Sequence, residues 1–273
     1  MEIIFQRNWF STVRGVHRRD LLAGTYLTGT DVEASGRLLI DRKTFVIKDA
    51  CWEVYRSPGG KLNGINPVPR LKGVTAYFNA GGELRRSVGN AAGGLAREML
   101  AECVRAVIQA ETFVYGDRGY PTAEAYGEYW EKHYLNSCRY YSNLHRVSRK
   151  WSDYVGNYCR GENFFNRAKF CSIAKKPDGL KASGGLSDSF HEMGVSFVLD
   201  REGRVTRCTG NFLRAPDPVC FENGAFLERF TGVVLPGCGK KEIAGIVGGP
   251  GGCDHLVDLI SDLGKAVRAA GGW

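Results

Sequence analysis

Two stretches of the chain, EASGRLLIDR at residues 33–42 and EMGVSFVLDR at residues 192–201, align without a gap at a spacing of 159 residues (33 to 192, 41 to 200). Both begin with glutamate, end with Asp-Arg and enclose a similar run of apolar residues. Such a run that ends at Asp-Arg-Lys or Asp-Arg-Glu-Gly is typical of a strand that reaches a turn. The pair indicates that the chain repeats one structural unit.

Further pairs of segments follow in the same order. Two of these pairs depart by one residue from the 159-residue spacing, as a loop or bulge would allow. The matching blocks are 4–11 with 164–171, 55–58 with 213–216, 70–74 with 229–233, and 88–89 with 247–248. Because these separated blocks keep one order, we predict a tandem duplication, with a first repeat at residues 1–108 and a second at 163–273.

Each repeat shows the same succession of local patterns. The extended run is followed by a second strand, then by a short third strand that carries the pair Gly73-Val74 or Gly232-Val233. A glycine-rich turn then leads into a segment with apolar residues at helical spacing, 95–107 or 255–269. The predicted fold class is therefore α+β, with a β-β-β-α unit occurring twice in a pseudo-twofold arrangement.

The connector between the repeats, residues 109–162, is dense in tyrosine and tryptophan. A flexible linker is polar or rich in glycine and proline, so this composition predicts packed structure instead. We expect one or two helices that begin after Pro121 and pack across the two repeats. Within the connector, residues 137–144 either line a pocket or form an amphipathic helix that buries tyrosines.

Composition narrows the class of protein. The formal net charge is +8, but the basic residues are scattered, which argues against a nucleic-acid-binding stripe and favours an acidic protein or a small anionic ligand as partner. No apolar run approaches the roughly 18 residues that a membrane span needs, and the first residues do not resemble a signal peptide. We expect a cytoplasmic protein in which the nine irregularly spaced cysteines are mostly reduced.

The repeats differ in the residues that carry chemistry. The second has five cysteines and two histidines, whereas the first has two cysteines and one histidine. His191, Cys253 and His255 stand where the first repeat has Val32, Gly94 and Ala96. This asymmetry predicts that the first repeat is a degenerate copy and that the second carries the functional site.

A run of glycines at 248–252, interrupted only by Pro250, leads directly into the last helix. Backbone amides of Gly251 and Gly252, together with the helix N-terminus, are suited to hold an anion. The same helix end should lower the pKa of Cys253, which would make it a nucleophile or a metal ligand. The alternative is an ordinary glycine turn with a half-buried cysteine and Asp254 as the helix cap.

Four side chains of the second repeat form a candidate metal set: His191, Cys220, Cys253 and His255, with Cys238 in reserve. A Cys2His2 set suits tetrahedral zinc, and a cysteine-rich variant suits iron or an iron–sulfur cluster. The chain has no Cys-x-x-Cys pair, and a single cysteine is more often a buried small apolar residue than a ligand.

These residues also carry a resemblance. The second repeat, with His191-Glu-Met, Pro216 through Cys220, and Gly-Gly-Cys-Asp-His-Leu at 251–256, resembles a bacterial family known only as domain of unknown function 2889. The family implies no activity. A β-meander followed by a glycine-cysteine helix start is also distantly similar to the U-type iron–sulfur scaffold proteins, although their three-cysteine pattern cannot be placed on this chain.

Three functions fit the sequence. The first is a metal or iron–sulfur handling protein, or a metal-dependent accessory factor, that uses the candidate metal set. The second is an enzyme for a small anionic substrate, with Cys253 as nucleophile, His255 or His191 as base and Arg214 as a charge clamp. The third is a non-catalytic adaptor that binds a protein partner. The nucleotide-binding glycine motifs and the serine-hydrolase elbow are absent, which argues against those classes.

Overall fold

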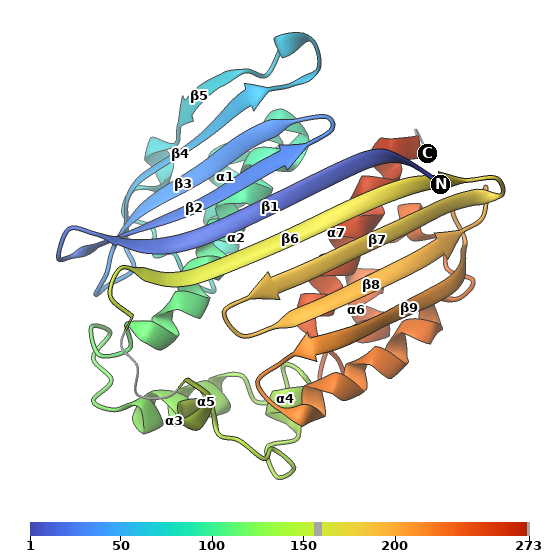
Figure 1. Ribbon diagram of the computed structural model, residues 1–273. Helices are drawn as coiled ribbons and strands as arrows, with labels where there is room; N and C mark the ends of the chain where they lie inside the picture. The colour runs from blue at the N-terminus through green and yellow to red at the C-terminus, as the bar shows by residue number, and fades with distance from the viewer. Residues whose placement is uncertain (156–159, 272–273) are drawn as a thin grey trace. The chain divides into compact units, whose positions relative to one another are not determined.

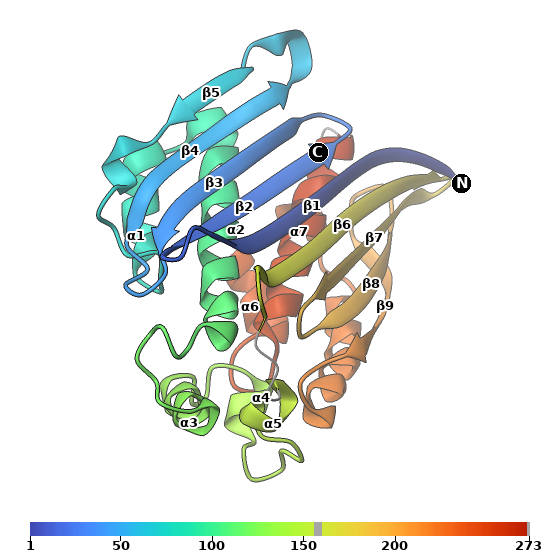
Figure 2. The same cartoon turned by 60° about the vertical axis from the view of Figure 1, so that its left-hand side comes forward.

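The computed structural model describes residues 1–155 and 160–271 and combines antiparallel β-sheet with α-helices (Figures 1 and 2). The α+β class is therefore confirmed. The chain divides into two compact units. The N-terminal unit comprises Trp9–Tyr126 and Val155–Ala168, and the C-terminal unit comprises Met1–Asn8, Gly127–Tyr154 and Lys169–Trp273.

The sheet of the N-terminal unit follows the order β5-β4-β3-β2-β1, with the start of β6 beside β1. Apolar and polar residues alternate along its strands, so that Leu21, Leu38 and Ile40 are buried on one face. The register pairs Leu21 with Ile40. The strands are β1 (Glu2–Val16), β2 (Asp20–Gly29), β3 (Glu33–Asp41), β4 (Ile47–Arg56) and β5 (Gly64–Pro67).

In the C-terminal unit the order is β6-β7-β8-β9, with the start of β1 beside β6. Met193, Val195, Phe197 and Leu199 alternate toward the buried face of β8, and Phe197 contacts Phe230 edge-on with ring centroids 5.5 Å apart. The strands are β6 (Asn163–Lys176), β7 (Gly179–Asp188), β8 (Glu192–Leu199) and β9 (Val205–Arg214).

One long helix packs on the sheet of each unit. Helix α2 (Leu95–Ala110) lies against β2 and β3, and α7 (Asp254–Gly271) lies against β7 (Figure 1). Glycine permits this close approach, because a Cβ added at Gly36 would lie 3.0 Å from the Cβ of Met99, and one at Gly184 would lie 3.2 Å from a methyl carbon of Leu259. Each helix is preceded by a shorter one, α1 (Ala80–Val88) or α6 (Lys240–Val247).

Local details recur between the units. Strand register shifts between Leu39 and Ile40 in the β3–β4 pair, and between Val198 and Leu199 in the β8–β9 pair. The Gly73 amide donates to the Ile47 carbonyl at 2.9 Å, and the Gly232 amide donates to the Val205 carbonyl at 2.8 Å. These features lie at matching positions of the two predicted repeats.

The β-β-β-α description of each repeat was wrong in two respects. Each unit has two strands before the one that begins at Glu33 or Glu192, since the aligned blocks 4–11 and 164–171 lie on the long strands β1 and β6. The Gly-Val pairs do not form a strand, because Gly73 and Gly232 adopt positive φ angles of 86° and 90° that break the extended backbone. Only the isolated bridges Val46–Thr75 and Arg204–Val234 remain there.

The connector is helical after Pro121, as expected, but with three helices in its described part where one or two were predicted: α3 (Ala123–His133), α4 (Arg139–Ser142) and α5 (Trp151–Val155). Residues 156–159 of the predicted connector lie outside the described part. The C-terminal unit takes in the first eight residues and residues 127–154, which are about half of the predicted connector. Within the described residues, no helix has the length and apolar character to cross a bilayer.

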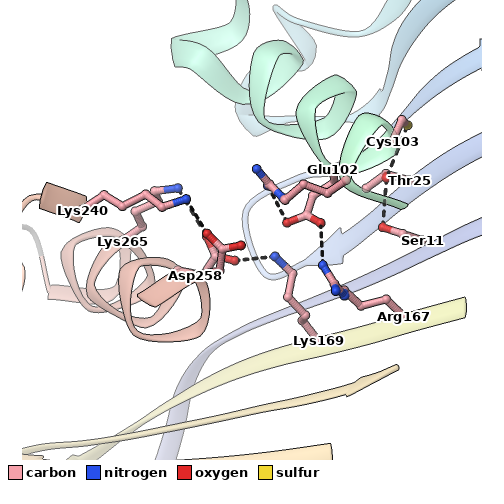
Figure 3. Close-up of polar contacts among 11 residues, drawn as sticks. Ser11, Thr25, Glu102, Cys103, Arg167, Lys169, Lys240, Asp258 and Lys265 are labelled. Carbon is pink, nitrogen blue, oxygen red and sulfur yellow. Dashed lines mark hydrogen bonds and ion pairs between the residues drawn. The ribbon is translucent and has the colours of Figure 1, made fainter. Parts of the chain in front are cut away.

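Buried charges are paired within each unit (Figure 3). In the N-terminal unit, Glu102 contacts Arg105 at 2.7 Å and Arg167 at 3.8 Å. In the C-terminal unit, the Lys169 ammonium lies 2.6 Å from the Asp262 carboxylate. Because an unpaired buried charge is costly, these partners fix the helices to β6 in one arrangement.

Replacing Leu100, which is fully buried in α2, by alanine should lower the free energy of unfolding by about 2–5 kcal/mol, since it removes methyl groups from a packed core. Denaturant titration measures the change. The matched control is Leu62→Ala, whose side chain is 45% exposed and should tolerate the change. Equal losses from both variants would contradict the assigned core.

Candidate functional site

The turn after β7 is organised by the carboxylate of Asp188. Its Oδ1 accepts hydrogen bonds from the backbone amides of Phe190 at 2.8 Å and His191 at 2.7 Å. The same oxygen lies 3.2 Å from Nδ1 of His191. Aspartate favours such turns because its short side chain reaches the amides two and three residues later. The result is a buried carboxylate that also positions the His191 ring.

Arg214, at the end of β9, reinforces this turn. Its Nη2 donates to the carbonyl oxygens of Asp188 at 2.6 Å and His191 at 3.3 Å. The pairing of β8 with β9 sets Glu192 opposite Arg214, which places the guanidinium at the turn. Arg214 was predicted as a charge clamp for a substrate, and its observed contacts are those of a residue that holds the histidine-bearing turn.

The loop between α6 and α7 sets the second side of the site. The Cys253 amide donates to the Val247 carbonyl at 2.7 Å, and the Gly252 amide donates to the Gly249 carbonyl at 2.8 Å. A Cβ at residue 252 would lie 2.1 Å from the Val247 oxygen, so the turn requires glycine. Of the amides predicted to cradle an anion, that of Gly252 already donates within the loop.

The turn after β7 and the loop before α7 bring the two histidines together. The rings of His191 and His255 face one another with centroids 3.9 Å apart and planes tilted by 31°. Donor atoms of Asp188, His191 and His255 all lie within 4.8 Å of one another. Cys253 extends this group, because its Sγ lies 4.0 Å from Nδ1 of His255. Of the predicted metal set, the structure therefore brings His191 and His255 together, and Cys253 contacts His255.

Burial determines the pKa of the cysteine thiols near the site. It raises the pKa of Cys253 well above the ordinary range, despite backbone hydrogen bonds from Leu256 and His255 that oppose the shift. The expectation that the start of α7 would make this thiol acidic was wrong, because removal from water outweighs the helix end. Burial also raises the pKa of Cys220 to about 12. In the absence of a cation, both groups are neutral thiols at pH 7.

The other residues predicted for the site, the two cysteines Cys220 and Cys238 and the two loop glycines, have different surroundings. Cys220 is buried beside Val219 and Tyr140, and Cys138 of the connector packs against this cluster. Cys238 follows a short 3₁₀ turn before α6 and is only half-buried. Gly251 and Gly252 offer their carbonyl oxygens to Arg139, the first through the guanidinium and the second through the backbone amide.

Sequence reasoning missed Asp188, although a signal was present. An aspartate three residues before a histidine, at the end of a strand, is the pattern of a carboxylate that caps a turn and orients an imidazole. It also missed the role of Arg139, which joins the connector to the glycine loop. That contact depends on residues far apart in the chain and leaves no local pattern.

Alkylation tests the state of Cys253. In the native, metal-free protein near pH 8, iodoacetamide should modify Cys253 much more slowly than Cys51, because the thiolate is the reactive form and burial raises the pKa of Cys253. The rate should rise with pH, and the difference should vanish in denaturant. Peptide mass spectrometry measures both sites, and faster modification of Cys253 than of Cys51 in the native protein would contradict the buried neutral thiol.

Comparison with known proteins bears on the C-terminal unit. Neither a search of curated proteins nor a search of solved structures gave a significant match. The likeness to iron–sulfur scaffold proteins therefore gains no support. The model of a family described as "Protein of unknown function (DUF2889)" matches residues 175–268, which contain Asp188, His191, Cys220, Cys253 and His255, so the candidate site lies within the segment that resembles this family.

Proposed function

We propose that this protein binds one transition-metal ion in its C-terminal unit, through His191, His255 and Cys253. The observation that carries the proposal is the approach of two imidazoles to a ring separation of 3.9 Å, with a carboxylate at 3.2 Å from one of them. A cation shared by the lone pairs of the two rings would hold them in this arrangement.

The donor types fit a borderline ion such as zinc or ferrous iron. Imidazole suits both metals, and a cysteine thiolate favours zinc or an iron site over magnesium and calcium. Zinc sites are built from histidine nitrogens and cysteine sulfurs, and three protein ligands leave a fourth position open. When bound, such an ion supplies Lewis acidity if a coordination position stays open, and structural cross-linking if all positions are filled.

Asp188 is assigned to orient His191 rather than to coordinate the ion. Its Oδ1 already accepts two amide hydrogen bonds and lies beside Nδ1 of His191. A proton held on Nδ1 leaves the lone pair of Nε2 for a metal, and carboxylates behind metal-ligating histidines commonly play this role. Arg214 then acts through the backbone by holding the same turn.

The alternative, a cysteine-dependent enzyme for a small anion, is less favoured. It needs a thiolate at Cys253, and burial raises the pKa of that group. Iron–sulfur binding would need more thiolates than Cys253 alone. An acidic or small anionic partner remains compatible with the net charge of +8, although Arg214 and the glycine loop already have partners within the protein.

We also infer that the chain arose by tandem duplication and that only the second copy kept the site. The matched register shifts and the matched hydrogen bonds of Gly73 and Gly232 support the duplication. Positions equivalent to Asp188, His191 and His255 are Gly29, Val32 and Ala96, which offer no side-chain donor. One ion per chain is therefore expected.

Metal titration tests the proposal. The metal-free full chain should bind one zinc or cobalt(II) ion, and His191→Ala or His255→Ala should remove most of the affinity. Asp188→Asn keeps an acceptor at the same place and should weaken binding by about 10–100-fold without changing the stoichiometry. Isothermal titration calorimetry and elemental analysis measure these values.

His145→Ala is the matched control, because His145 is an exposed histidine of the same unit. Circular dichroism should show an unchanged fold in every variant. Absence of metal binding by the wild-type protein, or equal binding by His191→Ala and wild type, would reject the proposed function. Complete loss in Asp188→Asn would instead make Asp188 a direct ligand.

A further inference from the structure

The side chains of the candidate metal site are largely closed to solvent. Asp188 and His191 are buried, and His255 is half-buried. An ion that binds to the two imidazoles has to reach them from outside the protein, so a site of this kind needs an entry path. An element that packs beside the histidines must therefore move when the ion enters or leaves.

Trp151, the first residue of α5, packs on the turn that carries His191. The centroid of its ring lies 4.9 Å from that of Phe190, with the planes at 51°. Phe190 directly precedes His191, and these two rings meet edge-on with centroids 6.4 Å apart. His191 in turn faces His255 at 3.9 Å. Trp151 is thus the end member of a row of rings that leads to the two histidines.

The residues just before Trp151 are anchored by the carboxylate of Asp217. Its Oδ2 accepts hydrogen bonds from the Ser148 amide at 2.8 Å, the Ser148 hydroxyl at 2.9 Å and the Arg149 amide at 3.1 Å. Its Oδ1 accepts from the Val219 amide at 2.9 Å. Burial opposes ionisation, but these hydrogen bonds hold the pKa of Asp217 below its ordinary range. One ionised carboxylate therefore attaches the connector to the loop that follows β9.

The same loop also holds the histidine-bearing turn. Arg214 precedes Asp217 by three positions (214 to 217), and its guanidinium donates to the carbonyl oxygens of Asp188 and His191. The loop after β9 therefore fixes the position of the connector relative to His191. Release of the Asp217 contacts would separate residues 148–151 from the turn and leave the Arg214 contacts intact.

The elements beside the histidines differ in how they are held. The His191 turn joins β7 to β8, which pair along their length, and the loop before α7 is fixed by the backbone bond from Cys253 to Val247. Residues 148–151 are held by side chains: the Asp217 carboxylate, the Trp151 ring and the Tyr140 hydroxyl, which donates to the Arg149 carbonyl at 3.2 Å. Segments with such attachments open at a lower free energy than paired strands.

We propose that residues 148–151 form a gate segment, which closes on the His191 turn and moves away from it when a metal ion enters or leaves. The proposal rests on the proposed metal binding and adds its regulation: the gate segment sets how fast the ion exchanges. A gate that is closed equally with and without the ion changes the entry and release rates by the same factor. The equilibrium affinity then stays the same.

Two variants loosen the gate segment in different ways, Trp151→Ala by removing the ring and Asp217→Asn by weakening the anchor. Release is measured by mixing the cobalt(II)-loaded full chain with excess EDTA, at chelator concentrations where the rate no longer depends on EDTA. Entry is measured by mixing the metal-free chain with cobalt(II). Both rates should rise by about 10-fold or more in each variant, because loss of buried contacts weakens the closed form.

The dissociation constant separates a gate from a structural support of the ligands. It should stay within about threefold of the wild-type value in both variants, since the two rates change together. Leu135→Ala is the control, because Leu135 is an exposed residue of the same connector, and all its values should match wild type. Thermal unfolding identifies a variant that fails to fold, and Asp217→Asn keeps the side-chain shape in case Trp151→Ala does so.

A second measurement needs no metal. Diethyl pyrocarbonate modifies imidazole rings that solvent reaches, and peptide mass spectrometry follows each histidine separately. In the metal-free wild type, His191 should react much more slowly than His17, an exposed histidine of the N-terminal unit. In Trp151→Ala and Asp217→Asn, the rate at His191 should rise toward that at His17, whereas Leu135→Ala should leave it unchanged.

The outcomes separate the two proposals. If the folded variants release cobalt(II) at the wild-type rate, or release it faster with an unchanged entry rate, the gate is overturned while the proposed function stands. If wild type binds no cobalt(II), the proposed function fails, and the modification of His191 decides the gate alone. A faster reaction in the variants then supports closure over the turn, and an unchanged reaction overturns it.

Discussion

A single backbone hydrogen bond, from the Cys253 amide to the Val247 carbonyl, sets the geometry on which the candidate site depends. It folds the chain back at the end of α6 so tightly that residue 252 has no room for a side chain. The start of α7 is thereby fixed, and with it His255. The turn capped by Asp188 presents His191 from the sheet, so the site forms where a helix start and a strand end meet.

Parts of the fold were predictable because they are local. In α7, the apolar residues Leu256, Leu259, Ile260 and Leu263 recur at helical spacing, and all four are buried against the core. The turns at Asp41 and Asp200 were also predicted from local sequence, because each follows an apolar run. The Gly73 and Gly232 segments were wrongly predicted as strands because a Gly-Val pair repeated in both halves resembles a strand in sequence, whereas the positive φ of the glycine depends on the three-dimensional turn.

The site was predictable only where the repeats could be compared. His191, Cys253 and His255 stand out because the first repeat has no side-chain donor at those places. Asp188 required the structure, since the turn after β7 brings its carboxylate beside His191. The acidity of Cys253 was misjudged for a similar reason: the helix start is visible in the sequence, but the burial that outweighs it is a property of the packed unit.

The division of the long strands β1 and β6 between the two units has a consequence for synthesis on the ribosome. Within the N-terminal unit, the Gly15 amide donates to the Glu162 carbonyl at 2.8 Å, so β1 must wait for a strand made much later. Contacts between such distant positions slow folding. The nascent N-terminal unit therefore exposes an unpaired strand edge until residue 168 has emerged.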